Sequence, residues 1–511
     1  MNRRRTLFGV VVSLAIIAFI FWLYTNGLSK NPPGFYVDEC GIAYNAQLIA
    51  HTGAGQYDGR FPLFFQFYSN GWTQWANPTQ IYLLAIPFRL FGPGILLARV
   101  FSAFWVFAAC LLLGVLAERI SRNPAIGIIV GALALVTPWL FEVSRLVFET
   151  YFYPLALVLF LMAVYRAQAK DQWRAGDIAF VATTLMLLTY SYTIGRLLGP
   201  LLALGLVFFV NTPERWSGVL KTWGVYALTL IPLAIFRFRH PAALTQRFYA
   251  ISYVNPETPW REIASHFVRR YLEDLSLISL LIDGDANPRH HVPGSLGSFL
   301  ASAFVLAVLG LFIIIVWRWR EQWWRFIVFG ALASVVPGSL TADQFHSLRM
   351  VAYPIFLLVL TIPALEYLSG WTYSYEPASD VSLAHVSKRV RRTVLAVLFC
   401  GAALQAAFFQ RAFRREGPDR EPFFDVDYKT IYDSAMAQGQ RQVYIIDGEY
   451  GPADACGYWY ATLEHRDPSE LIHLPEGGRA PAGTVVISSE TTCENCEIID
   501  KRGYYLAYRQ F

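Results

Sequence analysis

Two adjacent carboxylates, Asp38 and Glu39, follow the first apolar run of the chain, in the stretch GFYVDECGIAYN at 34–45. A carboxylate at the boundary between lipid and water is partly desolvated, which makes Asp38 a candidate general base for a hydroxyl group. Apolar residues follow at helical spacing as far as Gly53, so Asp38 also stands where a helix N-cap is expected, with Glu39 in the first turn. Both roles remain open, and Asp38 and Glu39 are our candidate catalytic pair.

Further polar side chains in the same segment are candidates for substrate binding. Asp58 and Arg60 stand in a turn, Asn77 precedes a proline, and Tyr82 lies in the apolar run that follows. We expect residues 79–91 to form a helix in the membrane interface, because counting this run as a span would invert the charges of the later loops. The nearby aromatic residues fit either a sugar-binding platform or an interfacial belt, and composition does not separate the two.

Charged residues and histidines recur in later turns beside the ends of apolar runs. They are Arg145 and Glu149, then Arg289, His290 and His291, and then His346 and Arg349. Arginine presents a planar fork of donors that matches a phosphate, so these residues predict a phosphate-binding cluster. Contacts with phospholipid headgroups are the alternative.

The pair His290 and His291 also raises the question of a metal, since Asp283 and Asp285 are close in the sequence. Adjacent histidines rarely bind one ion, and the two aspartates complete only a loose ligand set. We therefore expect that no cofactor is required, with a divalent ion at this loop as the alternative.

The composition places these turns at a membrane. Of 511 residues, 55% are hydrophobic and 15% are charged, and the mean hydropathy is +0.38. Soluble proteins carry about 25% charged residues, so we predict a polytopic α-helical membrane protein. The apolar run 7–26 follows three arginines and is long enough to be an uncleaved anchor.

The apolar runs predict about 11 spans in total. After the anchor they lie at 95–117, 124–141, 150–168, 177–193, 195–211, 219–237, 297–316, 324–340, 348–368 and 393–410. With the N-terminal arginines inside, every second loop is short and basic, as the positive-inside bias requires. We therefore expect the long polar segments and the C-terminus on the periplasmic or exterior face of the cytoplasmic (inner) membrane.

This topology predicts the domains. They are an anchor at 1–26, a first external loop at 27–94, a transmembrane core at 95–410 with an external loop at 238–296, and a tail at 411–511. The tail has β-type runs at 441–447 and 483–489 between turn residues, so we expect a small soluble α/β domain.

Three cysteines, Cys456, Cys493 and Cys496, lie in this tail. An oxidising compartment would pair two of them, and we expect a structural disulfide. The alternative is a zinc site completed by His465 or His473.

The sequence lacks the motifs of a nucleotide site. It contains no glycine-rich phosphate loop, no GxGxxG before a helix and no HExxH. We therefore expect a donor that comes from the membrane, and no nucleic-acid partner.

Taken together, these features resemble the GT-C fold glycosyltransferases. The features are the anchor, a first loop that opens with Asp-Glu, an interfacial helix entered through Asn-Pro, and a span that begins ARVFSA at 98–103. The protein O-mannosyltransferases and the lipid A aminoarabinose transferases of glycosyltransferase family 39 are the most similar groups, over most of residues 1–370. The chain has Asn77-Pro78-Thr79 where the mannosyltransferases have His-Pro-Pro, and it lacks their long external insertion. Both differences speak against a protein acceptor.

The resemblance implies a hexosyl or pentosyl transferase. Asp38 would be the base, Glu39 its neighbouring acid, and a polyprenyl phosphate with one sugar the donor. Arg145 stands in a turn like the family's external turn after the third span, and the turns at 289–291 and 346–349 resemble segments near its lipid-phosphate pocket. The implied partners are this donor, membrane lipids, and a glycan, lipid or protein whose hydroxyl accepts the sugar with inversion.

Two other functions are open to a chain of this class. A transporter or flippase for a lipid-linked saccharide would show ionisable residues within its spans or paired repeats, and neither stands out. A scaffold that recruits partners through its tail would not need both Asp38 and Glu39.

Overall fold

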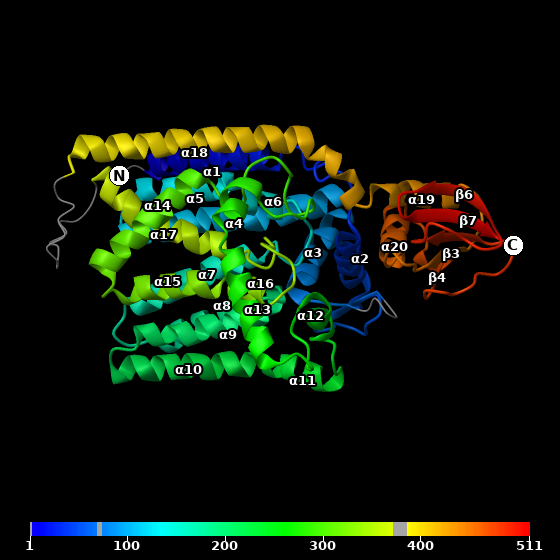
Figure 1. Ribbon diagram of the computed structural model, residues 1–511, viewed down its shortest axis with the longest axis horizontal. Coiled ribbons are helices and arrows are strands. Elements are labelled where there is room, and N and C mark those ends of the chain that lie inside the picture. The colour runs from blue at the N-terminus through cyan, green and yellow to red at the C-terminus, as the bar shows by residue number, and fades with distance from the viewer. Residues whose placement is uncertain (1–2, 69–73, 371–385) are drawn as a thin grey trace.

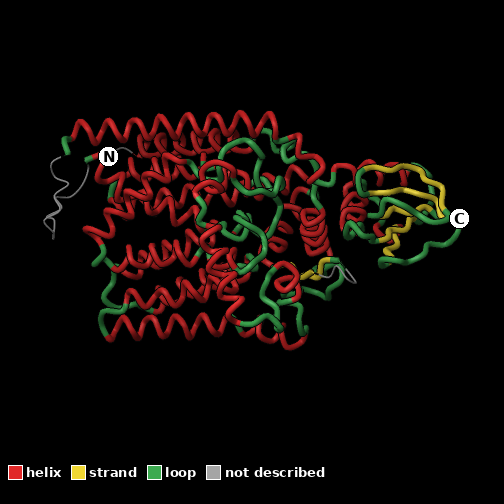
Figure 2. The backbone as a smooth tube through the Cα atoms, viewed as in Figure 1, coloured by secondary structure: helices red, strands yellow, loops and turns green. Residues whose placement is uncertain are grey.

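The computed structural model describes residues 3–68, 74–370 and 386–511. Helices lie side by side in an elongated body, and a smaller part containing a sheet extends from one end of it (Figure 1). Figure 2 shows that the strands are confined to this part, apart from one short ribbon at the same end of the body. The molecule is therefore a helical body with a sheet-containing part at its C-terminus.

The body consists of helices that coincide with the predicted spans. They are α1 (Arg3–Thr25), α4 (Ile95–Ser121), α5 (Pro124–Val136), α6 (Pro138–Val143), α7 (Tyr153–Gln168), α8 (Ala175–Ser191), α9 (Gly195–Gly205), α10 (Pro213–Thr229), α11 (Ile231–Arg239), α14 (Ala301–Ile313), α15 (Gln322–Ala333), α16 (Val336–Ser339), α17 (Tyr353–Ser369) and α18 (Lys388–Glu416). Among the described residues, 4 helices are long and apolar enough to cross a membrane, and they are Ile95–Ser121, Pro213–Arg239, Ala301–Arg318 and Lys388–Glu416. Shorter apolar helices of 10–17 residues stand beside them.

Helix α18 shows how the spacing of apolar residues orients these helices. Val390, Val397 and Leu404 recur every seven residues and are 52%, 64% and 71% exposed. Phe409 and Phe413 are buried in a cluster with side chains of α1, α4 and α6. Seven residues are about two helical turns, so the exposed side chains form one apolar stripe. Such a stripe is suited to contact with lipid.

Glycines allow a close contact between helices α4 and α5 of the body. A Cβ atom at Gly114 would lie 2.7 Å from the carbonyl oxygen of Gly127, and one at Gly127 would lie 2.7 Å from that of Gly114. No other residue fits this approach, which is typical of small residues in membrane helix pairs.

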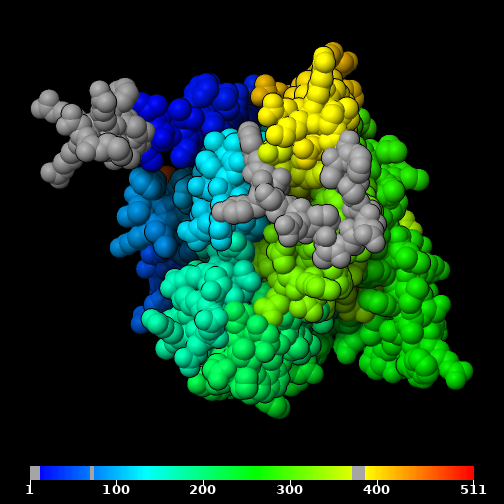
Figure 3. Space-filling view, turned by 90° about the vertical axis from the view of Figure 1, so that its left-hand side faces the viewer, coloured from blue at the N-terminus to red at the C-terminus, as the bar shows by residue number. Residues whose placement is uncertain are grey.

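Figure 3 shows the end of the body that lies opposite the sheet-containing part. Helices α10 and α18 both start at this end and run toward the sheet-containing part (Figure 1). The sequence assigns the loops before both helices to the same side of the membrane. The chain direction of these two helices therefore agrees with the expected topology.

The elements at the other end are α2 (Val37–Thr52), β1 (Phe65–Phe67), β2 (Gln74–Ala76), α3 (Pro78–Phe91), α12 (Gln246–Ile251) and α13 (Trp260–Asp274). The predicted interfacial helix 79–91 corresponds to α3, which packs mainly against α2. The N-cap prediction was wrong, since Tyr36 precedes the first helical residue and Asp38 lies inside α2. Helix α2 begins before Asp38 because the carboxylate of Glu39 accepts the backbone N–H of Tyr36 at 3.0 Å.

The C-terminal part contains α19 (Val426–Met436), α20 (Asp454–Leu463) and a five-stranded sheet of order β4-β3-β5-β7-β6. The strands are β3 (Val443–Ile446), β4 (Leu471–Leu474), β5 (Val485–Ser488), β6 (Cys496–Arg502) and β7 (Tyr505–Gln510). Strand β3 pairs in parallel with β4 and β5, whereas β7 is antiparallel to β5 and β6. The predicted β-type runs correspond to β3 and β5.

Disulfides link Cys493 to Cys496 and Cys40 to Cys456. The first is a pairing of the expected kind within the tail. The second joins α2 to α20. Its two cysteines are 416 residues apart in the sequence, so no local motif predicts the pairing. Because Cys456 is bonded to Cys40, it does not complete a zinc site with Cys493 and Cys496.

Candidate active site

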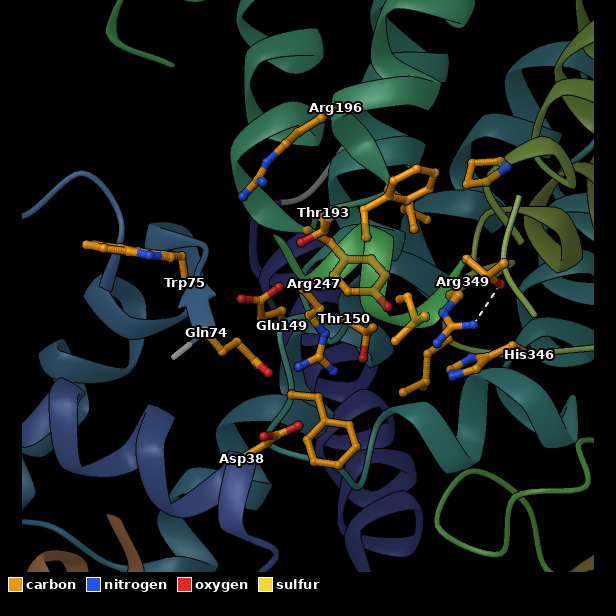
Figure 4. A pocket seen from close by; sticks show the side chains of 18 of the residues that line it. Asp38, Gln74, Trp75, Glu149, Thr150, Thr193, Arg196, Arg247, His346 and Arg349 are labelled. Atoms are coloured by element: carbon orange, nitrogen blue, oxygen red, sulfur yellow. Dashed lines mark hydrogen bonds between the residues drawn. The ribbon is translucent and has the colours of Figure 1, made fainter. Parts of the chain in front are cut away.

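A cavity of about 650 Å³ opens at the end of the helical body that carries α2, β2 and α12. Its walls come from α2, β2, the turn before α7, the start of α9, α12 with the loop before it, and the loops around 287–290 and 337–349. Figure 4 shows polar side chains from these separate segments pointing toward one another. The fold therefore brings distant parts of the chain to one site.

Asp38 projects from the first turn of α2 into this cavity (Figure 4). The hydroxyl of Tyr68 donates to its Oδ1 at 2.8 Å. Within the described residues this is its one side-chain hydrogen bond and it has no ion pair, so Oδ2 is open to a ligand. A half-buried carboxylate with an open oxygen can accept a proton from a bound hydroxyl group.

Glu39 lies on a different side of α2, because consecutive helical residues are about 100° apart. It is fully buried, and it forms an ion pair with buried Arg99 at 3.3 Å. Its other oxygen accepts the backbone N–H of Val147 at 3.0 Å. Glu39 does not line the cavity, and its contacts hold α2 against α4 and the turn before α7.

Glu149 is another carboxylate that lines the cavity. It accepts the backbone N–H of Asn77 at 2.6 Å and the side-chain amide of Asn77 at 2.8 Å. Arg196 in turn donates to the amide oxygen of Asn77 at 2.9 Å. Burial raises the pKa of Glu149, although the Asn77 hydrogen bonds and the charge of Arg196 oppose this. Asn77 does not line the cavity, and its hydrogen bonds hold the Glu149 carboxylate in place.

Basic side chains also line the cavity, and His346 and Arg349 lie across it from Asp38 (Figure 4). Arg289, His290, His346 and Arg349 all line the cavity. Arg349 donates to Asp343 at 2.7 Å, and the rings of His290 and His346 lie 4.6 Å apart. Burial, followed by the charges of His290 and Arg349, holds the pKa of His346 well below its usual range. A wall that disfavours another positive charge is suited to an anion such as a phosphate.

Asp285, His290 and His346 also lie close enough to be considered as metal ligands. Both oxygens of Asp285 are already occupied, one by the backbone N–H of Asn287 and the other by His290 and the two donors of Ser347. Since the cations around this group disfavour a further one, these residues do not fit a divalent ion, and we derive no step that uses one.

His291 lies outside the cavity and is fully buried. Its Nδ1 is 2.6 Å from the Glu142 carboxylate and its Nε2 is 2.5 Å from the Leu296 carbonyl oxygen. Both nitrogens face acceptors, which suits the doubly protonated ring. Burial lowers the pKa of His291, but the Glu142 charge and these hydrogen bonds outweigh it and raise the pKa above 6.5.

The stability of the protein should therefore depend on pH through His291. Because the pKa of His291 is higher in the folded state than in the unfolded state, its protonation stabilises the fold. This contribution is fully present below the unfolded pKa of 6.5, and it is lost as the pH rises through the folded pKa. We expect the free energy of unfolding to fall with a slope of at most about 1.4 kcal/mol per pH unit. Thermal denaturation between pH 6 and 9 measures this slope. His291→Gln should flatten it, and an unchanged slope would contradict the assignment.

The remaining predicted binding residues lie away from the cavity. Arg145 is buried and donates to the Tyr24 carbonyl oxygen at 2.7 Å, and its guanidinium lies over the Phe141 ring. Asp58 accepts the backbone N–H of Gln66 at 2.8 Å, and burial raises its pKa to about 6. Tyr82 donates to the Pro62 carbonyl oxygen, and Arg60 is exposed. These side chains do not line the cavity, and the hydrogen bonds of Arg145, Asp58 and Tyr82 named here go to backbone groups, so they support the fold around the site.

Other side chains of the cavity were not predicted as site residues, and they are Gln74, Trp75, Arg196 and Arg247. Tyr68, the hydrogen-bond partner of Asp38, does not line the cavity and was not predicted either. Arg247 lies between Asp38 and Glu149 (Figure 4), and although burial lowers its pKa, the charges of these two carboxylates outweigh that effect and raise it. It was one arginine among several in the loop 238–296, and no local pattern distinguished it.

No family model matches the chain, and no curated protein matches it in sequence. Solved structures do match it in fold. ArnT from Cupriavidus metallidurans in the apo state has a TM-score of 0.63 at 13% identity, with 98% of each chain covered. The same protein bound to undecaprenyl phosphate has a TM-score of 0.58 at 11% identity, again with 98% of each chain covered.

A third similar structure is the archaeal oligosaccharyltransferase AglB from Archaeoglobus fulgidus, in complex with an inhibitory peptide and a dolichol-phosphate. It has a TM-score of 0.52 at 13% identity and covers 93% of this chain and 69% of its own. ArnT and AglB are both GT-C fold glycosyltransferases. The chain therefore has the GT-C fold, and the resemblance seen in the sequence is confirmed at the level of the fold.

Proposed function

We propose that this protein is an integral membrane glycosyltransferase that moves a single sugar from a polyprenyl phosphate to an acceptor hydroxyl, with inversion. The observation that carries the proposal is that Asp38 lines the same cavity as a set of basic side chains, which are Arg289, His290, His346 and Arg349. ArnT bound to undecaprenyl phosphate and AglB with a dolichol-phosphate support a donor of this class.

The charges of the cavity suit each part of the reaction. Asp38 would take the proton of the acceptor hydroxyl as its oxygen attacks the anomeric carbon. The bond between that carbon and the phosphate oxygen breaks on the opposite face, and the polyprenyl phosphate leaves with the bonding electrons. Arg289 and Arg349 stabilise its charge, so no general acid is needed. Attack from the opposite face inverts the configuration.

The same geometry supports a proposed arrangement in the membrane. The cavity lies at the end of the body that carries α2, α3 and the C-terminal part. With about 11 spans and the basic loops at the other end, this is the periplasmic or exterior side of the cytoplasmic membrane. The external segments 27–94 and 411–511 would then form the soluble face above the catalytic core.

Removal of a cation from the cavity should weaken binding of the lipid phosphate. We expect Arg349→Met to raise the Kd for undecaprenyl phosphate by about 10- to 100-fold, because a hydrogen bond to a charged group is worth about 1.5–3 kcal/mol. Native mass spectrometry of the purified protein with added undecaprenyl phosphate measures this. Arg479→Met, at an exposed arginine of the C-terminal part, is the matched control. Equal affinities of the two variants would count against the phosphate site.

A further inference from the structure

A second group of polar side chains lies in the C-terminal part, outside the cavity. It consists of Asp447, Asp454 and His473. His473 on β4 is in register with Ile445 on β3, and Asp447 follows Ile445 by two residues, so both side chains face the same side of the sheet. Asp454 is the first residue of α20, which covers that side. The group thus occupies the carboxyl edge of parallel strands, where α/β sheets commonly bind ligands.

The three side chains converge closely. Each offers one ligand atom, and these atoms all lie within 4.8 Å of one another. The Nε2 of His473 is 2.8 Å from Asp447 Oδ2, and Asp447 Oδ1 accepts the backbone N–H of Ala453 at 2.9 Å. From the first external loop, Gln56 donates to Asp454 Oδ2 at 2.8 Å, and the Tyr57 hydroxyl donates to the same oxygen.

The charges of this group are not balanced by protein cations. Asp447 and Asp454 are 1% and 0% exposed. In the described parts of the chain, no lysine or arginine forms an ion pair with either carboxylate, and His473 supplies at most one positive charge. In addition, Asp454 Oδ1 is buried and has no hydrogen-bond partner there. A buried carboxylate oxygen without a partner is costly, and a bound cation would remove that cost.

This group differs from the one beside the cavity. There, the oxygens of Asp285 are saturated with donors and Arg349 adds positive charge nearby. In the C-terminal group, by contrast, two carboxylates lie beside a single histidine, and Asp454 Oδ1 has no hydrogen-bond partner among the described residues. The group around Asp285 therefore favours a bound anion, whereas the group around Asp454 favours a bound cation.

We propose that Asp447, Asp454 and His473 bind a divalent transition-metal ion. Two carboxylate oxygens and one imidazole nitrogen form a ligand set that Zn²⁺ accepts, with the Tyr57 hydroxyl or a water as the fourth ligand. The ion would tie the first external loop to the C-terminal sheet, two residues from Cys456 and its disulfide to α2. Its role is structural, because the group does not line the cavity.

The test uses full-length protein purified in detergent, stripped with a chelator and dialysed against Zn²⁺. We expect about one Zn²⁺ per chain by elemental mass spectrometry, and a higher thermal midpoint with Zn²⁺ than without it. Asp454→Asn and His473→Gln should each lower the affinity by at least about 10-fold, since even loss of an outer partner of a metal ligand costs this much. His473 is partly exposed, so its variant is expected to fold even where Asp454→Asn does not.

Two control variants locate the ion. His465→Asn changes an exposed histidine of the same part and should keep the wild-type stoichiometry. His290→Gln changes the group beside the cavity and should keep it as well. The proposal is overturned if wild-type protein binds no Zn²⁺, if His473→Gln binds it as tightly as wild type, or if the ion is lost in His290→Gln.

Discussion

Asp38→Asn should lower the rate of sugar transfer by about 10²- to 10⁴-fold, the usual contribution of a general base. Asparagine has the same shape and an amide oxygen that still accepts the Tyr68 hydroxyl, which lies 2.8 Å from Asp38 Oδ1 in the wild type. The substitution therefore removes the proton acceptor while keeping the local structure. Initial rates with purified protein at saturating donor and acceptor measure the effect.

The matched control is Asp419→Asn, which removes an exposed carboxylate near the C-terminal end of α18. This variant should transfer at the wild-type rate. Donor binding by Asp38→Asn should also remain close to wild type, because the basic side chains that line the cavity are unchanged. If Asp38→Asn kept a rate within threefold of wild type, Asp38 would be only a structural residue of α2.

Glu39→Gln should destabilise the folded protein strongly. Glu39 is fully buried and is the ion-pair partner of Arg99, which is 1% exposed. Glutamine would leave the arginine charge buried without a counter-ion, and breaking a buried pair in this way costs about 3–5 kcal/mol. It would also weaken the acceptor for the backbone N–H groups of Tyr36 and Val147. Thermal denaturation in detergent should show a clear drop in the unfolding midpoint.

Glu421→Gln, at an exposed glutamate of the C-terminal part, is the control and should leave the midpoint unchanged. Glu39→Gln with Arg99→Met should recover part of the lost stability, because it removes the unpaired charge as well. Full stability of Glu39→Gln together with lost transfer would instead return Glu39 to the chemistry, as the sequence pattern first indicated. The two outcomes separate a residue that supports α2 from one that acts on substrate.

The sequence predicts the secondary-structure elements better than the tertiary contacts between them. Runs of apolar residues give the positions of α4 and α18, and Asn-Pro gives the start of α3, because these signals are local. The N-cap was misplaced because Glu39 bonds backward to Tyr36, and side-chain direction is not visible in spacing.

The site itself could be predicted only in part. Asp38, Glu149 and the basic residues at 289–290 and 346–349 converge as expected. Arg247 was not predicted, since its position beside the carboxylates depends on how α12 packs. Cys40 was not assigned a partner for a similar reason, because its sulfur meets Cys456 only in the folded molecule.

The central claim is that the cavity catalyses transfer from a lipid-linked donor. Its most direct test is the chemical fate of a polyprenyl phosphate carrying one radiolabelled sugar, incubated with the protein in liposomes and an acceptor extract of the cell envelope. The account predicts that label leaves the lipid and appears in an acceptor with inverted anomeric configuration, with wild-type protein and not with Asp38→Asn. Label that stays on the lipid while the lipid crosses the bilayer would contradict it and would identify a transporter.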